Sequence, residues 1–223
     1  MPRILCLPGF GTNQKIMKYQ LRMFAKELPN FEFVIMDPFY DLDKSLYKIR
    51  YPFLSLLPEE EKIYGWTPFN QPSFKEIPIT LKKFVDYINE TGPYDGMLGF
   101  SQGGRLIHLF ITELEKGTIK YNFKHPKFYI FICGYTSYEL TEINFELKTS
   151  EAKTIHLLGT KDDLFSASYF MTLKYINPLV LFFNQPHKIP YIDSESYKKI
   201  KRFITSEMTN EANGKNNKMK AKL

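Results

Sequence analysis

The sequence predicts an α/β fold: a doubly wound, mostly parallel sheet of six strands with helices on both faces. Three observations predict it. Short apolar runs recur along the chain, segments of helical period separate them, and a glycine-flanked serine stands where one run passes into a helix. Such alternation is typical of parallel strands joined by crossover helices. At 223 residues, the chain is long enough for one domain of this kind.

Six apolar runs are the predicted strands, and each is too short to span a bilayer. They cover residues 4–8, 33–37, 94–100, 127–133, 154–158 and 179–183. The expected strand order is 2-1-3-4-5-6. In that order the loops after the first and third strands face each other at the topological switch point of the sheet.

Apolar residues at steps of three and four predict the helices between these strands. Two such sets are Met17, Leu21, Phe24 and Leu28, and Ile77, Leu81, Phe84 and Ile88. A third helix is expected directly after Ser101 and ends near Gly117, since glycine is common just past a helix end. A last helix is predicted over residues 194–204.

Two segments interrupt this rhythm. Residues 39–73 are rich in Tyr, Phe, Leu and Pro and contain the only Trp of the chain, Trp66. A connection of this length is usually a functional lid, so we expect Trp66 and Phe69 to bind substrate, although a purely structural flap is an equal alternative. Residues 208–223 are polar and rich in Lys, and they are predicted to be a disordered tail after one domain of residues 1–207.

The charge distribution argues against nucleic acid as a partner. The formal net charge is +6, and half of it comes from residues 209–223, where four Lys stand against one Glu. Basic runs with interleaved aromatic residues do not occur elsewhere. The N-terminal apolar stretch is too short for a signal peptide, so we expect a cytoplasmic protein without stable membrane insertion.

The two cysteines, Cys6 and Cys133, each lie in an apolar run. They are interpreted as reduced core residues and not as a disulfide framework. The sequence also shows no cluster of His, Cys and Asp with the spacing of metal ligands, so no metal site is predicted.

The motif with the most chemical content is GPYDGMLGFSQGG, residues 92–104. A short strand runs into the letters GFSQG and then into a helix, which is the G-x-S-x-G elbow in its required context. Gly99 and Gly103 are needed there because a Cβ at either position would collide with neighbouring backbone. Ser101 is therefore predicted to be a nucleophile exposed at the carboxyl edge of the sheet.

A serine nucleophile needs a base, and His187 is the best-placed histidine. It lies in NQPHKIP directly after the last strand, where a loop puts its imidazole at the same edge as Ser101. The other histidines lie in a helix, before a strand and within a strand, at His108, His125 and His156.

The third member of such a site is a carboxylate that orients the imidazole. Asp162 and Asp163 both follow the penultimate strand and the turn at Gly159. Asp162 is our choice, and the chain order Ser101, Asp162, His187 is the order that elbow hydrolases show. The other aspartate of the pair is expected to belong to a solvated turn.

An oxyanion hole requires two backbone N–H groups. Gln102 supplies one at the start of its helix. Because the loops after the first and third strands face each other, the N–H of Phe10 is expected to supply the second.

Six pieces of the sequence, ILCLPGFGTN, VIMDPF, GPYDGMLGFSQGG, FYIFICGY, LLGTKDDLF and PHKIP, occur in this order. Together they resemble the serine hydrolase FSH family of α/β-hydrolases, over nearly the whole chain to about residue 205. The resemblance implies an α/β-hydrolase fold and a metal-free carboxylesterase-like enzyme. It also implies Ser101, Asp162 and His187 as the charge-relay residues.

We therefore expect a hydrolase that needs no cofactor and cleaves a small-molecule acyl ester through an acyl-enzyme. The aromatic insertion favours medium to long acyl chains. The alternatives are an acyl-protein thioesterase or lysophospholipase with the same elbow, and a non-catalytic binding protein on the same scaffold.

Overall fold

The structure, a computed structural model, describes residues 1–49, 52–68, 76–136 and 150–220 of the chain. Its main sheet has six strands in the order β2-β1-β5-β6-β7-β8, and all five pairings are parallel. The strands are β1 (Arg3–Leu7), β2 (Glu32–Ile35), β5 (Gly96–Phe100), β6 (Phe128–Ile132), β7 (Thr154–Gly159) and β8 (Leu179–Phe183). The predicted fold and strand order are confirmed.

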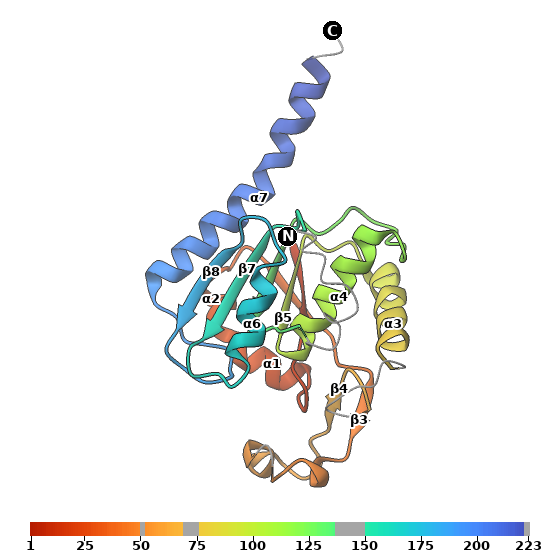
Figure 1. Cartoon of the computed structure of the whole chain (residues 1–223), viewed down its shortest axis with the longest axis vertical. Coiled ribbons are helices and arrows are strands. Elements are labelled where there is room, and N and C mark those ends of the chain that lie inside the picture. The colour runs from red at the N-terminus through yellow and green to blue at the C-terminus, as the bar shows by residue number, and fades with distance from the viewer. Residues whose placement is uncertain (50–51, 69–75, 137–149, 221–223) are drawn as a thin grey trace.

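Helices cover both faces of the sheet (Figure 1). They are α1 (Gln14–Gln20), α2 (Arg22–Glu27), α3 (Glu76–Thr91), α4 (Gln102–Lys116), α6 (Phe165–Thr172) and α7 (Ser194–Lys220). Alternate residues of β1 point to opposite faces, so Ile4 packs with the apolar residues of α1, α2 and α7, and Leu5 packs with those of α3 and α4.

The first predicted helix is two helices in the structure. Leu21 separates α1 from α2 with ψ near 0°, outside the α-helical range, while its side chain stays buried. Met17, Phe24 and Leu28 are also buried, so the apolar spacing survives the break. The spacing alone therefore could not reveal it.

A small hairpin stands where a long lid was predicted. It consists of β3 (Tyr40–Leu42) and β4 (Ile63–Gly65), which pair antiparallel, and between them lie the 3₁₀ helices η1 (Lys44–Leu46) and η2 (Pro52–Leu56). We call residues 40–67 the flap. Strands of three residues carry too little alternation to be recognised in sequence.

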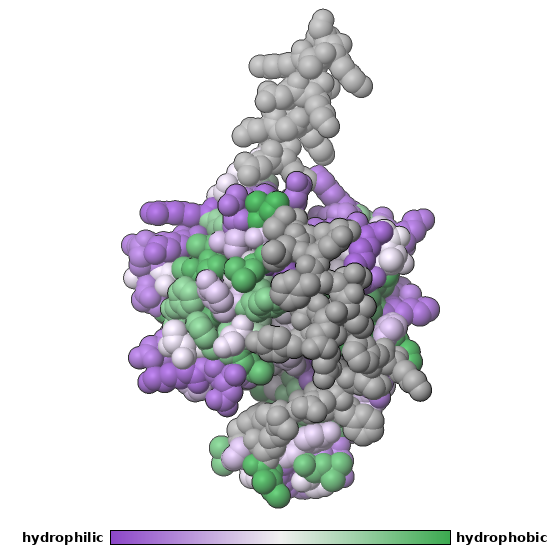
Figure 2. All heavy atoms as spheres, viewed as in Figure 1, coloured by the Kyte–Doolittle hydropathy of each residue, from purple (hydrophilic) through white to green (hydrophobic). Residues whose placement is uncertain are grey.

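The flap has a core of its own. Leu42, Leu54 and Ile63 are buried together, with Tyr47 packed against them. Other apolar residues of the flap stay exposed. They are Leu46, Ile49 and Leu56, with exposed fractions of 73%, 96% and 85%. The flap forms the lower end of the molecule in Figure 2, where apolar surface is seen.

The last helix differs from the prediction. Residues 208–223 were expected to be disordered after a helix over 194–204, but α7 continues to Lys220 and projects beyond the sheet (Figure 1). Its sequence has no proline, and Gly214 is its only strong helix breaker, so nothing local ends the helix earlier. Among the described residues, no helix combines the length and the apolarity that a membrane span requires.

Two histidines that the sequence analysis set aside form a buried polar group with Tyr175. His108 Nδ1 lies 2.7 Å from the Tyr175 hydroxyl, and the ring of His156 lies 5.3 Å from that of Tyr175. His156 is only 1% exposed, and its Nε2 lies 3.1 Å from Thr154 Oγ1. Burial lowers the pKa of His108 to about 4 and that of His156 to about 3.

Acid should therefore destabilise the fold. Both histidines are neutral in the folded state, whereas the unfolded chain binds a proton on each near pH 6.5, so stability falls as pH drops below that value. Between pH 7 and pH 5 each histidine should lower the free energy of unfolding by about 2 kcal/mol. Urea unfolding at the two pH values measures this loss.

The matched variants are His156→Gln and His125→Gln, because His125 is exposed. His156→Gln should shrink the pH-dependent loss by about 2 kcal/mol, and His125→Gln should leave it unchanged. An undiminished loss in His156→Gln would show that this residue is not buried in its neutral form.

Candidate active site

Ser101 stands on a sharp turn between β5 and α4. Its backbone has φ 54° and ψ −119°, which L-residues rarely adopt. A Cβ at Gly99 would lie 2.4 Å from the Gly104 nitrogen, and one at Gly103 would lie 2.2 Å from the Leu7 carbonyl oxygen. Both glycines of the elbow are therefore required by backbone that comes too close for any side chain.

The structure brings the three residues predicted as nucleophile, base and acid into one chain of hydrogen bonds. His187 Nε2 lies 2.8 Å from Ser101 Oγ, and His187 Nδ1 lies 2.7 Å from Asp162 Oδ2. Ser101 follows β5, Asp162 follows β7 and His187 follows β8, so all three come from the carboxyl edge of the sheet.

Asp162 lies in an environment that keeps it ionised. Burial on its own would raise the pKa of this carboxyl group, but hydrogen bonds from His187 and from the Leu164 N–H, at 2.8 Å, lower it more. The net pKa is below its ordinary value. Asp163, by contrast, is exposed, in keeping with its expected place in a solvated turn.

The loops that carry Asp162 and His187 are held together by backbone contacts. The Thr160 N–H donates to the Phe183 carbonyl at 2.9 Å, and a Cβ at Gly159 would lie 2.6 Å from the Gln185 carbonyl oxygen. The acid and the base are therefore fixed to each other by the chain and not only by their own hydrogen bond.

The loop after β1 lies against Ser101. A Cβ at Gly9 would stand 3.3 Å from the Ser101 Cβ, and Phe10 is the next residue of this loop. Gln102 follows Ser101 at the first position of α4. The flap holds this loop in place, since the Gly11 N–H donates to the Tyr64 carbonyl at 2.9 Å.

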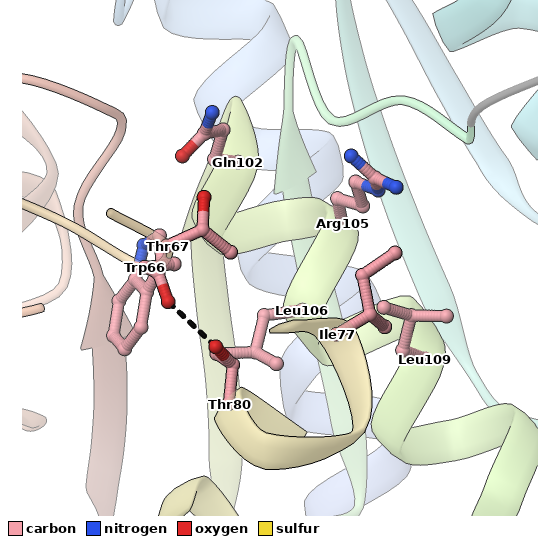
Figure 3. A pocket seen from close by; sticks show the side chains of 8 residues that line it. All are labelled: Trp66, Thr67, Ile77, Thr80, Gln102, Arg105, Leu106 and Leu109. Atoms are coloured by element: carbon pink, nitrogen blue, oxygen red, sulfur yellow. Dashed lines mark hydrogen bonds between the residues drawn. The ribbon is translucent and has the colours of Figure 1, made fainter. Parts of the chain in front are cut away.

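Trp66 joins the flap to the same loop. Its indole N–H donates to the Pro8 carbonyl at 2.7 Å, and its ring packs edge-on against Phe39. Its backbone carbonyl accepts from the Thr80 hydroxyl at 2.7 Å (Figure 3). Trp66 therefore has a structural contact on each side and is 3% exposed. Phe69, the other predicted substrate-binding residue, lies outside the described residues.

An open pocket adjoins Gln102, the residue that follows Ser101 (Figure 3). Trp66 and Thr67 line it from the end of the flap, and the rest of the wall comes from the first turns of α3 and α4. Those residues are Ile77, Thr80, Gln102, Arg105, Leu106 and Leu109. Leu106 and Leu109 belong to the apolar part of the wall, and Gln102 and Arg105 form its polar part.

Cys133, predicted to be a reduced core residue, is free and buried in the core cluster at this edge. It directly follows β6, has φ 47°, and its Sγ lies 3.7 Å from the Lys188 carbonyl oxygen. The ligand atoms of Cys133, Asp162 and His187 all lie within 4.8 Å of one another. Cys133 directly follows a strand, as Ser101 does, and this position was the sequence signal that it lies near the site.

Comparison with known proteins identifies the family. The model of the family described as serine hydrolase (FSH1) matches residues 1–199. The chain belongs to this family. It is therefore a serine hydrolase of the esterase type, as the resemblance of its six sequence pieces implied.

Its relatives include esterases from animals and fungi. It is 26% identical to "Esterase C25G4.2" of Caenorhabditis elegans, over 92% of this chain and 94% of that protein. It is 27% identical to "Esterase FPY3" of Fusarium mangiferae, over 93% and 97% of the two chains.

Solved structures show the same fold at lower identity. The crystal structure of Arabidopsis thaliana SOBER1 superposes with a TM-score of 0.59 at 17% identity. The match covers 93% of this chain and 99% of the SOBER1 chain. Esterase PE8 gives a TM-score of 0.55 at 16% identity, with 92% of each chain covered. Both likenesses concern the fold alone.

Proposed function

We propose that this serine hydrolase cleaves carboxylic esters with medium to long acyl chains, with Ser101 as nucleophile, His187 as base and Asp162 as the orienting acid. The observation that carries the proposal is the unbroken line of hydrogen bonds from Ser101 Oγ through the imidazole to a buried carboxylate. Of the described residues, these three have the geometry that nucleophilic acyl transfer requires.

The reaction follows from this geometry. His187 Nε2 accepts the Ser101 proton as the hydroxyl oxygen attacks the acyl carbonyl, and Asp162 stabilises the imidazolium that forms. The backbone N–H groups of Phe10 and Gln102 stabilise the oxyanion. The imidazolium then protonates the leaving alcohol, and water, deprotonated by the same histidine, hydrolyses the acyl-enzyme.

The other readings share parts of this account. A thioesterase or lysophospholipase would use the same three side chains, and only the leaving group or the acyl carrier would differ. A non-catalytic binding protein has no need for a serine in a strained conformation beside a hydrogen-bonded imidazole, which disfavours that reading.

The pocket beside Ser101 is the site we assign to the acyl chain. Gln102, one of the residues that line it, directly follows the nucleophile, and Leu106 and Leu109 lie on the same face of α4. An acyl chain that enters past Gln102 would bury its methylenes against these leucines and Trp66. Each buried methylene contributes about 0.8 kcal/mol.

Loss of the nucleophile or the base should abolish most of the activity. Ser101→Ala and His187→Ala should each lower kcat for an activated ester by several orders of magnitude, because only oxyanion stabilisation and binding remain. Hydrolysis of p-nitrophenyl esters measures this. Turnover near that of the wild type in either variant would reject the corresponding role.

The two aspartates provide a matched pair. Asp162→Asn should lose most of the activity, since an amide cannot hold the imidazole in the required tautomer, whereas Asp163→Asn should lose little. Steady-state kinetics of both variants on one ester decides between them. The reverse pattern would move the role to Asp163.

Acyl-chain preference tests the pocket. The kcat/KM for p-nitrophenyl hexanoate or octanoate should exceed that for the acetate at least roughly tenfold, the gain from one to two buried methylenes. A flat or falling series would show that the pocket does not hold the acyl chain.

Filling the pocket provides the control for this preference. Leu109→Trp should reduce the ratio of octanoate to acetate kcat/KM by roughly tenfold, because the indole takes the space of the distal methylenes. Ile79→Trp places the same side chain on α3 at a residue that is 52% exposed and does not line the pocket, so it should leave the ratio unchanged.

A further inference from the structure

Cys133 lies beside the acid and the base of the proposed site, with its Sγ within 4.8 Å of a ligand atom of each. We propose that Cys133, Asp162 and His187 form a binding site for a thiophilic divalent cation, Zn²⁺ or Cd²⁺, and that this cation inhibits the enzyme. The inference rests on the proposed function in one respect: that His187 is the base whose loss stops hydrolysis.

The backbone at Cys133 is held in a costly conformation. A φ of 47° lies in the left-handed region, which costs a non-glycine residue about 1–3 kcal/mol, and such outliers cluster at functional sites. The Cys133 N–H donates to the Leu157 carbonyl at 2.9 Å, which anchors it to β7. Its Sγ lies 3.7 Å from the carbonyl oxygen of Lys188, the neighbour of His187.

The three ligand atoms are almost at the separations that a tetrahedral cation needs. They lie within 4.8 Å of one another, and bonds of 2.0–2.3 Å to a tetrahedral ion place its ligand atoms roughly 3.4 Å apart. A separation of 4.8 Å must close by about 1.4 Å, and the 2.7 Å contact between Asp162 and His187 must open by about 0.7 Å.

The exposed part of the His187 side chain offers an entry path. The side chain of Asp162 is 1% exposed and Cys133 is buried, but the side chain of His187 is 33% exposed. A cation can therefore reach the site from the side of His187, and a water molecule can complete its coordination.

The donor set selects soft cations. A thiolate, an imidazole and one carboxylate suit Zn²⁺ and Cd²⁺, whereas Mg²⁺ and Ca²⁺ prefer oxygen ligands only. Burial raises the pKa of the Cys133 thiol, so the cation itself must displace the thiol proton. This makes the site selective for ions that form strong bonds to sulfur.

Binding would remove the base by a change of tautomer. In the free enzyme His187 Nδ1 faces the carboxylate of Asp162, which can only accept a hydrogen bond, so the ring proton is assigned to Nδ1 and Nε2 accepts from Ser101. When the cation bonds to Nδ1, that proton moves to Nε2, which can no longer accept one. The thiol proton is released to solvent, so one proton leaves the protein for each cation bound.

Titration of the full-length wild-type protein with Cd²⁺ tests the site by two independent measurements. A cadmium–thiolate absorption band in the ultraviolet should rise to one equivalent, with release of one proton, and hydrolysis of a p-nitrophenyl ester should fall in parallel. EDTA should reverse both, and Mg²⁺ should produce neither.

Cys133→Ala and Cys6→Ala are the matched variants, since both cysteines are buried and Cys6 lies in β1 with its Sγ on the Ile4 carbonyl. The Cd²⁺ concentration for half-inhibition should rise at least roughly tenfold in Cys133→Ala and Cys133→Ser, each relative to its own uninhibited rate, and should stay constant in Cys6→Ala.

An absent thiolate band in the folded wild type, or inhibition that persists in both Cys133 variants, would overturn the site. A wild type that shows the band but hydrolyses no ester would contradict the proposed function and leave the cation site standing. The two failures are therefore distinguishable.

Discussion

The site depends on one constraint, the close approach of backbone where β5 turns into α4. At Gly103 a Cβ would stand 2.2 Å from the Leu7 carbonyl oxygen, and at Gly99 it would stand 2.4 Å from the Gly104 nitrogen. Only glycine allows α4 to lie this close to β1, and that closeness forces Ser101 into its left-handed turn. The packing of α4 against the sheet balances this strain. The buried residues of α4 lie between Gln102 and Ile111.

Around that turn, the edge of a parallel sheet supplies the rest of the chemistry. The carboxyl ends of β1, β7 and β8 lie at this edge, and each is followed by one loop of the proposed site: the loops of the oxyanion donor Phe10, of Asp162 and of His187. The flap reinforces the first of these loops through Trp66 and Pro8, so one element both walls the pocket and steadies the loop next to Ser101. The shape of the pocket and the position of Phe10 are therefore coupled through the flap.

Much of this could be predicted from the sequence, because strand order and the G-x-S-x-G elbow together define which loops meet. The six strands and the proximity of Ser101, Asp162 and His187 follow from that logic. The β3–β4 hairpin could not be predicted, since its strands are only three residues long. The break at Leu21 leaves the apolar spacing intact, and the length of α7 depends on the absence of a stop signal. Cys133 is a buried core residue, as its apolar run predicts, but its closeness to Asp162 and His187 could not be predicted because that run describes β6 and not the turn that follows.

Covalent labelling tests whether Ser101 is the activated nucleophile of the site. The folded protein would be treated with a fluorophosphonate, which reacts with serines that an adjacent base has activated, and the modified residue would be located by mass spectrometry of its peptides. We expect one adduct per chain, on Ser101, with the other serines unmodified. A stoichiometric adduct on another residue, or none on the folded protein, would contradict it.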